Sequence, residues 1–347
     1  MKNVLLIACL VSILPVCFFA QEKTIGTVKG KVTDFETKEA LTNATVFLEN
    51  TTFGTVTDLK GSYEIADAEP GTYTLIASMV GYEIKKIPVQ ITAGRVLEVN
   101  AVLRQKPVVL GQVNVIGKVS DDWQGYLEIF EREFLGTSKY SGSTKILNPE
   151  VINFRKDKDT KQLTAFSDST IVVENRAMGY KLFILLEYFS YDTNGEIDYL
   201  AHVRFLELTS PDSDEKEDWK EKRLYCYLGS QKHFFRSLIS NRLYEEGFRV
   251  KMGPMYSLIK GGGNYVSEKD LRVEDYGDGV FMLPLETGLK VEFLERNLTV
   301  SYVIPVAPFI LLDKSGNRAD KNNMKVAGYW AEQRMSSALP YNYSPGR

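Results

Sequence analysis

Short runs of β-forming residues, each closed by turn residues, follow one another through positions 26–104 and constrain the fold more than any other feature. The turns hold Asp58-Leu59-Lys60-Gly61, Pro70-Gly71, Gly81 and Ala93-Gly94, and glycine allows the left-handed backbone that tight turns often need. About seven such runs in about eighty residues are typical of a small antiparallel β-sandwich. We therefore expect residues 24–106 to form an all-β domain. The runs span residues 27–33, 44–48, 54–57, 62–65, 72–79, 83–91 and 96–103.

The same region resembles a known family. The sequence GKVTDFETKEALTNATVFLENTTFGTVTDLKGSYEI, followed by PGTYTLIASMVGY, is similar to the carboxypeptidase regulatory-like domain, which is a transthyretin-like β-sandwich. That domain also stands at the N-terminus of many TonB-dependent outer-membrane transporters, and it carries no catalytic residues. The resemblance therefore implies packing, docking or ligand contact. It rests on Gly30, Val32, Asp34, Thr37, Leu41, Ala44, Val46, Gly54-Thr55, Thr57-Asp58, Gly61, Tyr63, Pro70-Gly71, Tyr73 and Gly81-Tyr82. Residues 107–120 are expected to form a linker strand, because 109–117 resembles the strand that precedes the plug of those transporters.

The N-terminus has the organisation of a secretory signal peptide. Lys2 precedes an apolar run over residues 4–20, and the polar sequence QEKT follows it. We expect residues 1–20 to be removed by cleavage between Ala20 and Gln21. A lipid anchor on Cys17 is an alternative, since LPVC resembles a lipobox, although Val16 fits that motif poorly. A membrane-spanning anchor is the other alternative, but the apolar run is short for a span and Pro15 interrupts it.

Composition limits the compartments and the partners that can be expected for this chain. The 347 residues include 42 basic and 45 acidic side chains, a formal charge of −3, so we expect no nucleic-acid partner. Signal cleavage would leave Cys226 as a single thiol, which cannot form an internal disulfide. The mature chain has no other apolar stretch long enough for a transmembrane helix. We expect an exported protein that is periplasmic or associated with the outer membrane.

Residues 121–347 alternate helical and strand patterns, which predicts an α+β domain. Aromatic and leucine residues recur at helical spacing from Trp123 to Phe134 and predict an amphipathic helix that ends at Gly136. We expect this stripe to pack on a core; a partner-binding stripe is the alternative. Strands are expected over 163–166, 170–174, 180–191, 197–208, 289–294 and 298–304, with 192–196 turning a hairpin.

Two further helices are expected between these strands. The first should begin with Ser210 as N-cap and Pro211 as first residue, carry acids before bases, and end at Gly229. The second should span residues 230–246 and end at Gly247. Blocks 147–154, 174–192, 224–248 and 328–345 resemble a poorly characterised module that follows the regulatory-like domain in exported proteins of Gram-negative bacteria. That resemblance implies no particular activity. The second helix would present a basic side, either solvated or facing an acidic partner, made of Lys232, His233, Arg236 and Arg242.

No pattern of catalytic residues is found, and we expect no catalytic, cofactor-binding or metal-ligating residues. Zinc peptidases carry histidines in motifs such as HExxH, whereas His202 and His233 fit neither that motif nor HxxE. Cys226 lies between two tyrosines in a helical pattern, which is typical of a buried structural thiol. The run Gly261-Gly262-Gly263 lacks the phosphate-loop pattern and indicates a flexible loop, and no GxSxG elbow is present.

These observations favour a noncatalytic accessory or binding protein of the bacterial cell envelope. Its expected partners are outer-membrane or periplasmic proteins, or a glycan, in an outer-membrane-associated assembly. The alternative is a glycosidase-like hydrolase with its carboxylates in the C-terminal domain. Two catalytic acids can come from any two positions in the sequence, so no pair can be singled out from the sequence.

Overall fold

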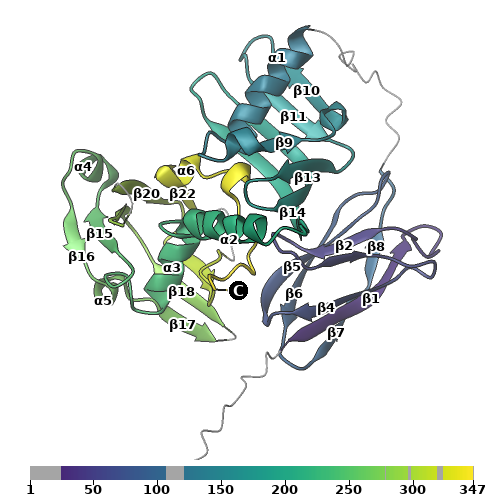
Figure 1. The fold of residues 1–347 in the computed structure, drawn as a ribbon, viewed down its shortest axis with the longest axis horizontal. Coiled ribbons are helices and arrows are strands. Elements are labelled where there is room, and N and C mark those ends of the chain that lie inside the picture. The colour runs from purple at the N-terminus through teal and green to yellow at the C-terminus, as the bar shows by residue number, and fades with distance from the viewer. Residues whose placement is uncertain (1–24, 107–120, 278, 296–297, 319–322, 347) are drawn as a thin grey trace, which may run out of the picture.

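The computed structural model describes residues 25–106, 121–277, 279–295, 298–318 and 323–346 (Figure 1). The expected signal peptide with its Ala20–Gln21 cleavage site, the Cys17 anchor and the linker strand over 107–120 lie outside these residues. Three hydrophobic cores organise the described chain, one in the N-terminal sandwich and two in the C-terminal region. We call residues 121–227 the first lobe, residues 228–330 the second lobe and residues 331–346 the tail. The α+β domain expected over 121–347 is therefore built around two cores.

The N-terminal domain is a β-sandwich, as the turn spacing predicts. One sheet joins β4, β1 and β7, with β8 also paired to β1, and the other has the order β3-β2-β5-β6. The expected run over 96–103 divides into two short strands, and both pair with β1 in parallel. The purely antiparallel arrangement predicted for the sandwich is therefore wrong at this edge. The strands are β1 (Gly26–Asp34), β2 (Thr45–Leu48), β3 (Gly54–Val56), β4 (Ser62–Ala68), β5 (Gly71–Ser78), β6 (Lys85–Ile91), β7 (Val96–Glu98) and β8 (Ala101–Leu103).

Two glycines of the sandwich are required by their surroundings. A Cβ on Gly30 would lie 1.8 Å from the carbonyl oxygen of Val99, which belongs to the connection between β7 and β8. Gly61 has a φ of 69°, and a Cβ there would lie 2.6 Å from the carbonyl oxygen of Val32. Side chains other than glycine are strained at such a φ, so the turn and its close approach both depend on this residue.

The first lobe is a six-stranded antiparallel sheet covered by a helix. Its strands have the order β10-β11-β13-β12-β9, and β14 pairs with β13 along the predicted hairpin. The predicted aromatic stripe packs on this sheet: Phe130 and Phe134 are fully buried and Trp123 is partly buried against the core. The elements are α1 (Asp121–Phe130), the π-helical turn η1 (Glu131–Leu135), η2 (Ser141–Ser143), β9 (Thr144–Ile146), η3 (Pro149–Val151), β10 (Ile152–Lys156), β11 (Leu163–Ser167), β12 (Ile171–Asn175), β13 (Tyr180–Tyr191), β14 (Ile197–Glu207) and α2 (Ser213–Tyr227).

The second lobe packs a helix against two sheets. A five-stranded sheet has the order β16-β15-β19-β20-β22, and a three-stranded sheet has the order β17-β18-β21. Phe234 and Phe235 of α3 are fully buried in the core that these sheets share. The elements are α3 (Gln231–Ile239), β15 (Phe248–Gly253), α4 (Met255–Ile259), β16 (Asn264–Val266), α5 (Glu268–Leu271), β17 (Glu274–Gly277), β18 (Val280–Pro284), β19 (Gly288–Phe293), β20 (Thr299–Pro305), β21 (Phe309–Asp313) and β22 (Met324–Gly328).

Two predicted helix boundaries are wrong. The N-cap of α2 is Asp212, whose carboxylate accepts a hydrogen bond from the Asp214 amide, so Ser210 and Pro211 lie before the helix. A carboxylate at this position also favours the helix dipole, which explains the later start. Helix α3 ends at Ile239, because Asn241 adopts a φ of 55° and the chain then turns until Gly247.

The tail runs between the three cores. Helix α6 (Tyr329–Glu332) leads from the second lobe into the tail, and η4 (Met335–Ser337) packs on the first lobe. The Tyr341 amide then donates to the carbonyl of Asn50 in the sandwich. Figure 1 shows this yellow segment in the centre of the molecule, among the helices of the C-terminal region. The C-terminal residues therefore connect parts of the structure that are distant in sequence.

Candidate functional site: the cleft between the sandwich and the C-terminal region

The loop after β2 joins the sandwich to the first lobe. The Asn50 amide donates to the carbonyl of Val203, and the Phe205 amide donates to the carbonyl of Thr51, so the loop continues the sheet beyond β14. The side chain of Asn342 in the tail hydrogen-bonds to Thr52 from the other side. Backbone and side-chain contacts therefore hold the domains together on both sides of this loop.

A charged cluster supports the same joint. His202, on β14, is 3% exposed; its Nδ1 lies 2.8 Å from Glu49 Oε1 and its Nε2 lies 2.5 Å from Glu187 Oε1. Lys86, from the sandwich, forms an ion pair with Glu187 as well. An imidazolium can donate to both carboxylates at once, whereas a neutral ring can donate to only one. Burial would raise the pKa of Glu187, but hydrogen bonds from Lys86 and His202 outweigh it and hold this pKa below its ordinary range.

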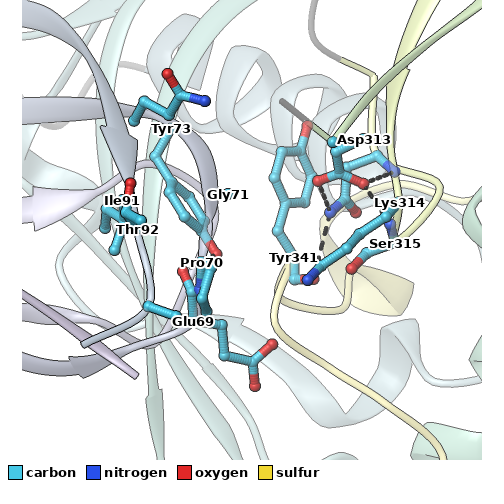
Figure 2. Close-up of a pocket in the computed structure, with 14 residues that line it drawn as sticks. Glu69, Pro70, Gly71, Tyr73, Ile91, Thr92, Asp313, Lys314, Ser315 and Tyr341 are labelled. Atoms are coloured by element: carbon cyan, nitrogen blue, oxygen red, sulfur yellow. Dashed lines mark hydrogen bonds between the residues drawn. The ribbon is translucent and has the colours of Figure 1, made fainter. Parts of the chain in front are cut away.

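Beside this joint, the sandwich and the second lobe enclose a cleft of about 340 Å³ (Figure 2). One wall comes from the turn before β5 and the end of β6. The other wall comes from the loop after β21 and from the tail. Figure 2 shows the rings of Tyr73 and Tyr341 facing each other from the two walls. The lining residues are Glu69, Pro70, Gly71, Tyr73, Gln90, Ile91, Thr92, Ala93, Gly279, Asp313, Lys314, Ser315, Asn317 and Tyr341.

Both tyrosines of the cleft are neutral phenols over the physiological pH range. Burial raises the pKa of Tyr73, and the nearby carboxylates of Glu69 and Asp313 raise it further. Burial raises the pKa of Tyr341 to about 12. The Tyr73 hydroxyl donates to the carbonyl of Glu69, and this bond fixes the tyrosine ring near the start of β5. The cleft therefore offers two oriented aromatic faces.

The polar residues of the cleft divide into two groups. Asp313 accepts hydrogen bonds from the amides of Ser315 and Asn317 and from the side chain of Asn317, so its carboxylate holds the turn after β21. By contrast, the side-chain amide of Gln90 and the ammonium of Lys314 have no hydrogen-bond partner among the residues that the structure describes. Those two groups are available to a ligand.

A second pocket of about 410 Å³ continues the cleft toward the first lobe, and Glu69 lines both. Its walls include Phe53, Trp219 and Tyr343. Arg223 lies 4.0 Å from the ring centre of Tyr180 and donates to the carbonyls of Met178 and Gly179, which fixes it in the wall. The second pocket is therefore also rich in aromatic and cationic side chains.

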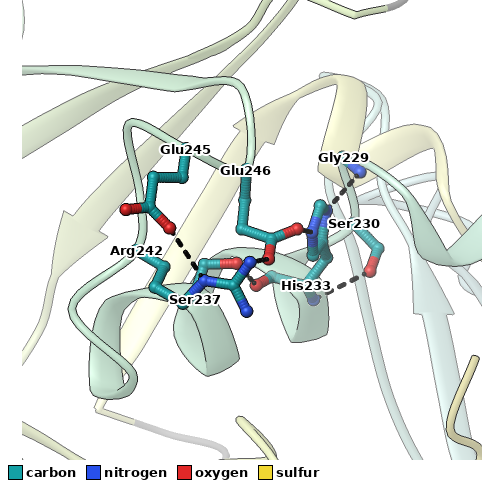
Figure 3. A network of polar contacts seen from close by, with 7 residues as sticks. All are labelled: Gly229, Ser230, His233, Ser237, Arg242, Glu245 and Glu246. Atoms are coloured by element: carbon teal, nitrogen blue, oxygen red, sulfur yellow. Dashed lines mark hydrogen bonds and ion pairs between the residues drawn. The ribbon is translucent and has the colours of Figure 1, made fainter. Parts of the chain in front are cut away.

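His233 lies in a separate network on the second lobe (Figure 3). Its Nδ1 accepts a hydrogen bond from the Gly229 amide at 3.0 Å, so its proton is on Nε2, which faces Glu246 at 3.2 Å. Burial lowers the pKa of His233, although Glu246 opposes the shift. Arg242 pairs with Glu246 and Glu245. With both ring nitrogens engaged, His233 has no lone pair free for a metal or for general-base catalysis.

The structure also places the other candidates from the sequence. Cys226 is buried, as expected, with its Sγ 3.6 Å from Met178 Sδ. The three glycines follow α4, and two of them have positive φ. The expected basic side of the second predicted helix is wrong: Lys232 donates to the carbonyls of Tyr341 and Tyr343, and His233 is buried. This side of α3 binds the protein's own tail, because the helix lies inside the C-terminal region.

The described residues contain no group of three or more His, Cys, Asp or Glu side chains that could hold a metal ion. None of the described helices has the length and apolar character required to cross a membrane. No pattern in the sequence indicates the cleft. Tyr73 appears there as a mark of the resemblance and Tyr341 only within a similar block, and no local pattern indicates that the two would face each other.

Comparison with known proteins confirms the resemblance of the N-terminal region. Residues 28–115 match the family described as CarboxypepD_reg-like domain. A stretch of 99 residues is 34% identical to the TonB-dependent receptor SusC of Bacteroides thetaiotaomicron; it spans 28% of this chain and 9% of the receptor. The chain thus covers a small part of that relative's length.

Two solved structures illustrate the structural matches. The minor pilin GBS52 of Streptococcus agalactiae is 16% identical, with a TM-score of 0.23, and the match covers 26% of this chain and 49% of the pilin. A Bacteroides uniformis protein, provisionally described as carbohydrate-binding, is 10% identical with a TM-score of 0.20 over 83% of this chain and 98% of that one. TM-scores this low do not establish a shared fold across the chain.

Proposed function

Taking the N-terminal carboxypeptidase regulatory-like domain as the premise, we propose that this chain is a noncatalytic binding protein of the cell envelope whose interdomain cleft binds a glycan. The observation that carries the proposal is the pair of tyrosine rings on opposite walls of the cleft, one from the sandwich and one from the tail (Figure 2). Pyranose rings have apolar C–H faces that pack on aromatic rings, and hydroxyls that pair with amides and ammonium groups. Gln90 and Lys314 supply such groups beside the rings.

The cleft favours binding over hydrolysis. A glycosidase needs two carboxyl groups on either side of the scissile bond, one of them free to take or give a proton. Asp313 is on one wall and Glu69 on the other, but Asp313 already accepts three hydrogen bonds from its own turn. The glycosidase-like alternative therefore has weaker support than a binding role.

Binding can be tested with cellohexaose, mannohexaose and chitohexaose as probes, titrated into the mature chain by calorimetry. We expect at least one of these neutral sugars to bind without being cleaved. Tyr73→Ala should weaken that binding about fivefold, since an aromatic contact contributes about 1 kcal/mol beyond its buried area. Lys314→Ala removes an exposed side chain and tests the same cleft without touching a core.

The matched control is Tyr256→Ala, which removes a tyrosine that is 78% exposed on α4, away from the cleft. It should leave the affinity unchanged. Equal affinities for wild type, Tyr73→Ala and Lys314→Ala would show that the sugars bind elsewhere. Cleavage of a probe by the wild-type chain would favour the hydrolase.

The same proposal places the protein outside the cytoplasm, in the periplasm or at the outer membrane, with envelope proteins as further partners. The charge and apolar pattern of residues 2–20 supports export. N-terminal sequencing of the protein from an envelope fraction should give Gln21 as first residue. An intact Met1, or an acyl chain on Cys17, would contradict this part of the proposal.

A further inference from the structure

The five-stranded sheet of the second lobe has one face that is not packed against the core. Val250, Val291 and Val303 point inward and are buried under α3, and side chains alternate along a strand, so their neighbours point outward. Helix α4 covers one end of the outer face, where Met255 and Leu258 approach Gly288. Figure 1 shows α4 at the end of β15 and β16.

A single row of side chains crosses the rest of this outer face. In register, Tyr265 pairs with Lys251, Lys251 with Lys290, and Lys290 with Tyr302, so two lysines lie side by side between two tyrosines. Like charges directly opposite each other destabilise a sheet. Glu292 offsets part of this repulsion, because its carboxylate lies 2.6 Å from the Lys290 ammonium.

Lys251 is the lysine of the pair that has no carboxylate partner among the described residues. Its ammonium lies 4.7 Å from the ring centre of Tyr265 and donates to the carbonyl of Gly261. Tyr265 is 63% exposed, so its ring is open to a ligand. A cation fixed on an exposed aromatic ring therefore stands in the middle of the row.

The outer face is basic although the chain is acidic. The outward positions of the five strands carry Arg249, Lys251, Lys290 and Lys325, with Glu292 as the one carboxylate among the described residues there. The whole chain has a formal charge of −3. A basic sheet face on an acidic chain suits an anionic ligand.

We propose that this face binds an acidic oligosaccharide, with a carboxylate at Lys251 and sugar rings on the two tyrosines. Tyr265 and Tyr302 stand three strand spacings apart, about 14 Å, which suits a trisaccharide or longer chain laid across the strands. An acidic peptide would satisfy the lysines but would make no particular use of two aromatic faces, so the tyrosines favour the sugar. The site is separate from the interdomain cleft.

The test is calorimetric titration of the mature chain with trigalacturonate, with cellotriose as the uncharged counterpart. We expect trigalacturonate to bind, cellotriose to bind much more weakly, and added salt to weaken the former because it screens exposed charges. Lys251→Gln should lower the trigalacturonate affinity about tenfold, and Tyr265→Ala should lower it similarly. Lys60→Gln, which alters an exposed lysine of the sandwich, should change nothing.

Several results would overturn the proposal. They are no binding of trigalacturonate, an affinity that Lys251→Gln and Tyr265→Ala leave unchanged, or tighter binding of a glutamate trimer than of trigalacturonate. Tyr73→Ala should leave this site intact, and Lys251→Gln should leave the cleft intact, so failure of either site is distinguishable from failure of the other.

Discussion

Replacing His202 by alanine is predicted to loosen the joint between the sandwich and the first lobe. The ring lies between Glu49 and Glu187 and is 3% exposed, so the variant keeps two partly buried carboxylates and removes the donor that they share. Leaving a buried hydrogen-bonding group without its partner costs about 1–3 kcal/mol, and more when that group is charged. Two carboxylates lose their shared donor while Lys86 still faces Glu187, so we expect a loss of about 3 kcal/mol.

Native-state hydrogen exchange measures this loss at the joint itself. The amides of Asn50 and Phe205 donate across the joint, to Val203 and Thr51, and are exposed when it opens. A loss of about 3 kcal/mol should speed their exchange about 100-fold. The Val32 amide, which bonds to Gly61 inside the sandwich, should keep its rate.

The matched control is His233→Ala, which removes the other buried histidine from the second lobe. It should leave the exchange of Asn50 and Phe205 as in the wild type. Unchanged rates in His202→Ala, or equal acceleration by the two histidine variants, would show that His202 does not hold the joint together.

Three further predictions concern the sandwich and the tail. Hydrogen bonds, led by that of the Thr37 amide, hold the pKa of the Asp34 carboxyl at about 2. The stabilisation that this carboxylate contributes should therefore be complete above its ordinary pKa and be lost as the pH falls toward about 2. Over this pH range the melting temperature should fall less steeply for Asp34→Asn than for the wild type. Gly61→Val should cost at least about 2 kcal/mol in urea unfolding, and Gly94→Val, which shares the positive φ but has open space, only about 1 kcal/mol; equal losses would contradict the close approach. Lys232→Met should release the tail and speed its cleavage by subtilisin, and an unchanged digestion pattern would count against the anchoring role.

Local patterns in the sequence predict much of the fold. The hairpin of β13 and β14 follows from two long β-rich runs around a short turn, and its strand bounds differ from the prediction by one residue at most. The aromatic stripe of α1 predicts burial correctly, since helical periodicity determines which side chains face a core. Turn spacing likewise predicts the sandwich.

Other features depend on contacts between distant segments. The parallel pairing of β7 and β8 with β1 has no local signal, because pairing direction is set by the path of the chain between strands. The charged side of α3 looks like a solvated face in sequence, yet Lys232 binds carbonyls of a tail more than a hundred residues later. Periodicity describes one helix and cannot show what covers it.

The cleft likewise depends on contacts between segments that are distant in the sequence. Tyr73 and Tyr341 come from opposite ends of the chain, and their rings line one cleft only because the loop after β2 docks on β14 and the tail docks on that loop. The outer face of the five-stranded sheet similarly needs the register of four strands before its row of tyrosines and lysines becomes visible. Residue types alone cannot bring these side chains together.

The most direct test of glycan binding in the cleft is a crystal structure of the mature chain with the neutral hexasaccharide that binds most tightly in the calorimetric titration. We expect a sugar ring between Tyr73 and Tyr341, with hydroxyls paired to the side chains of Gln90 and Lys314. A sugar found only at another surface, with the cleft holding solvent, would contradict it.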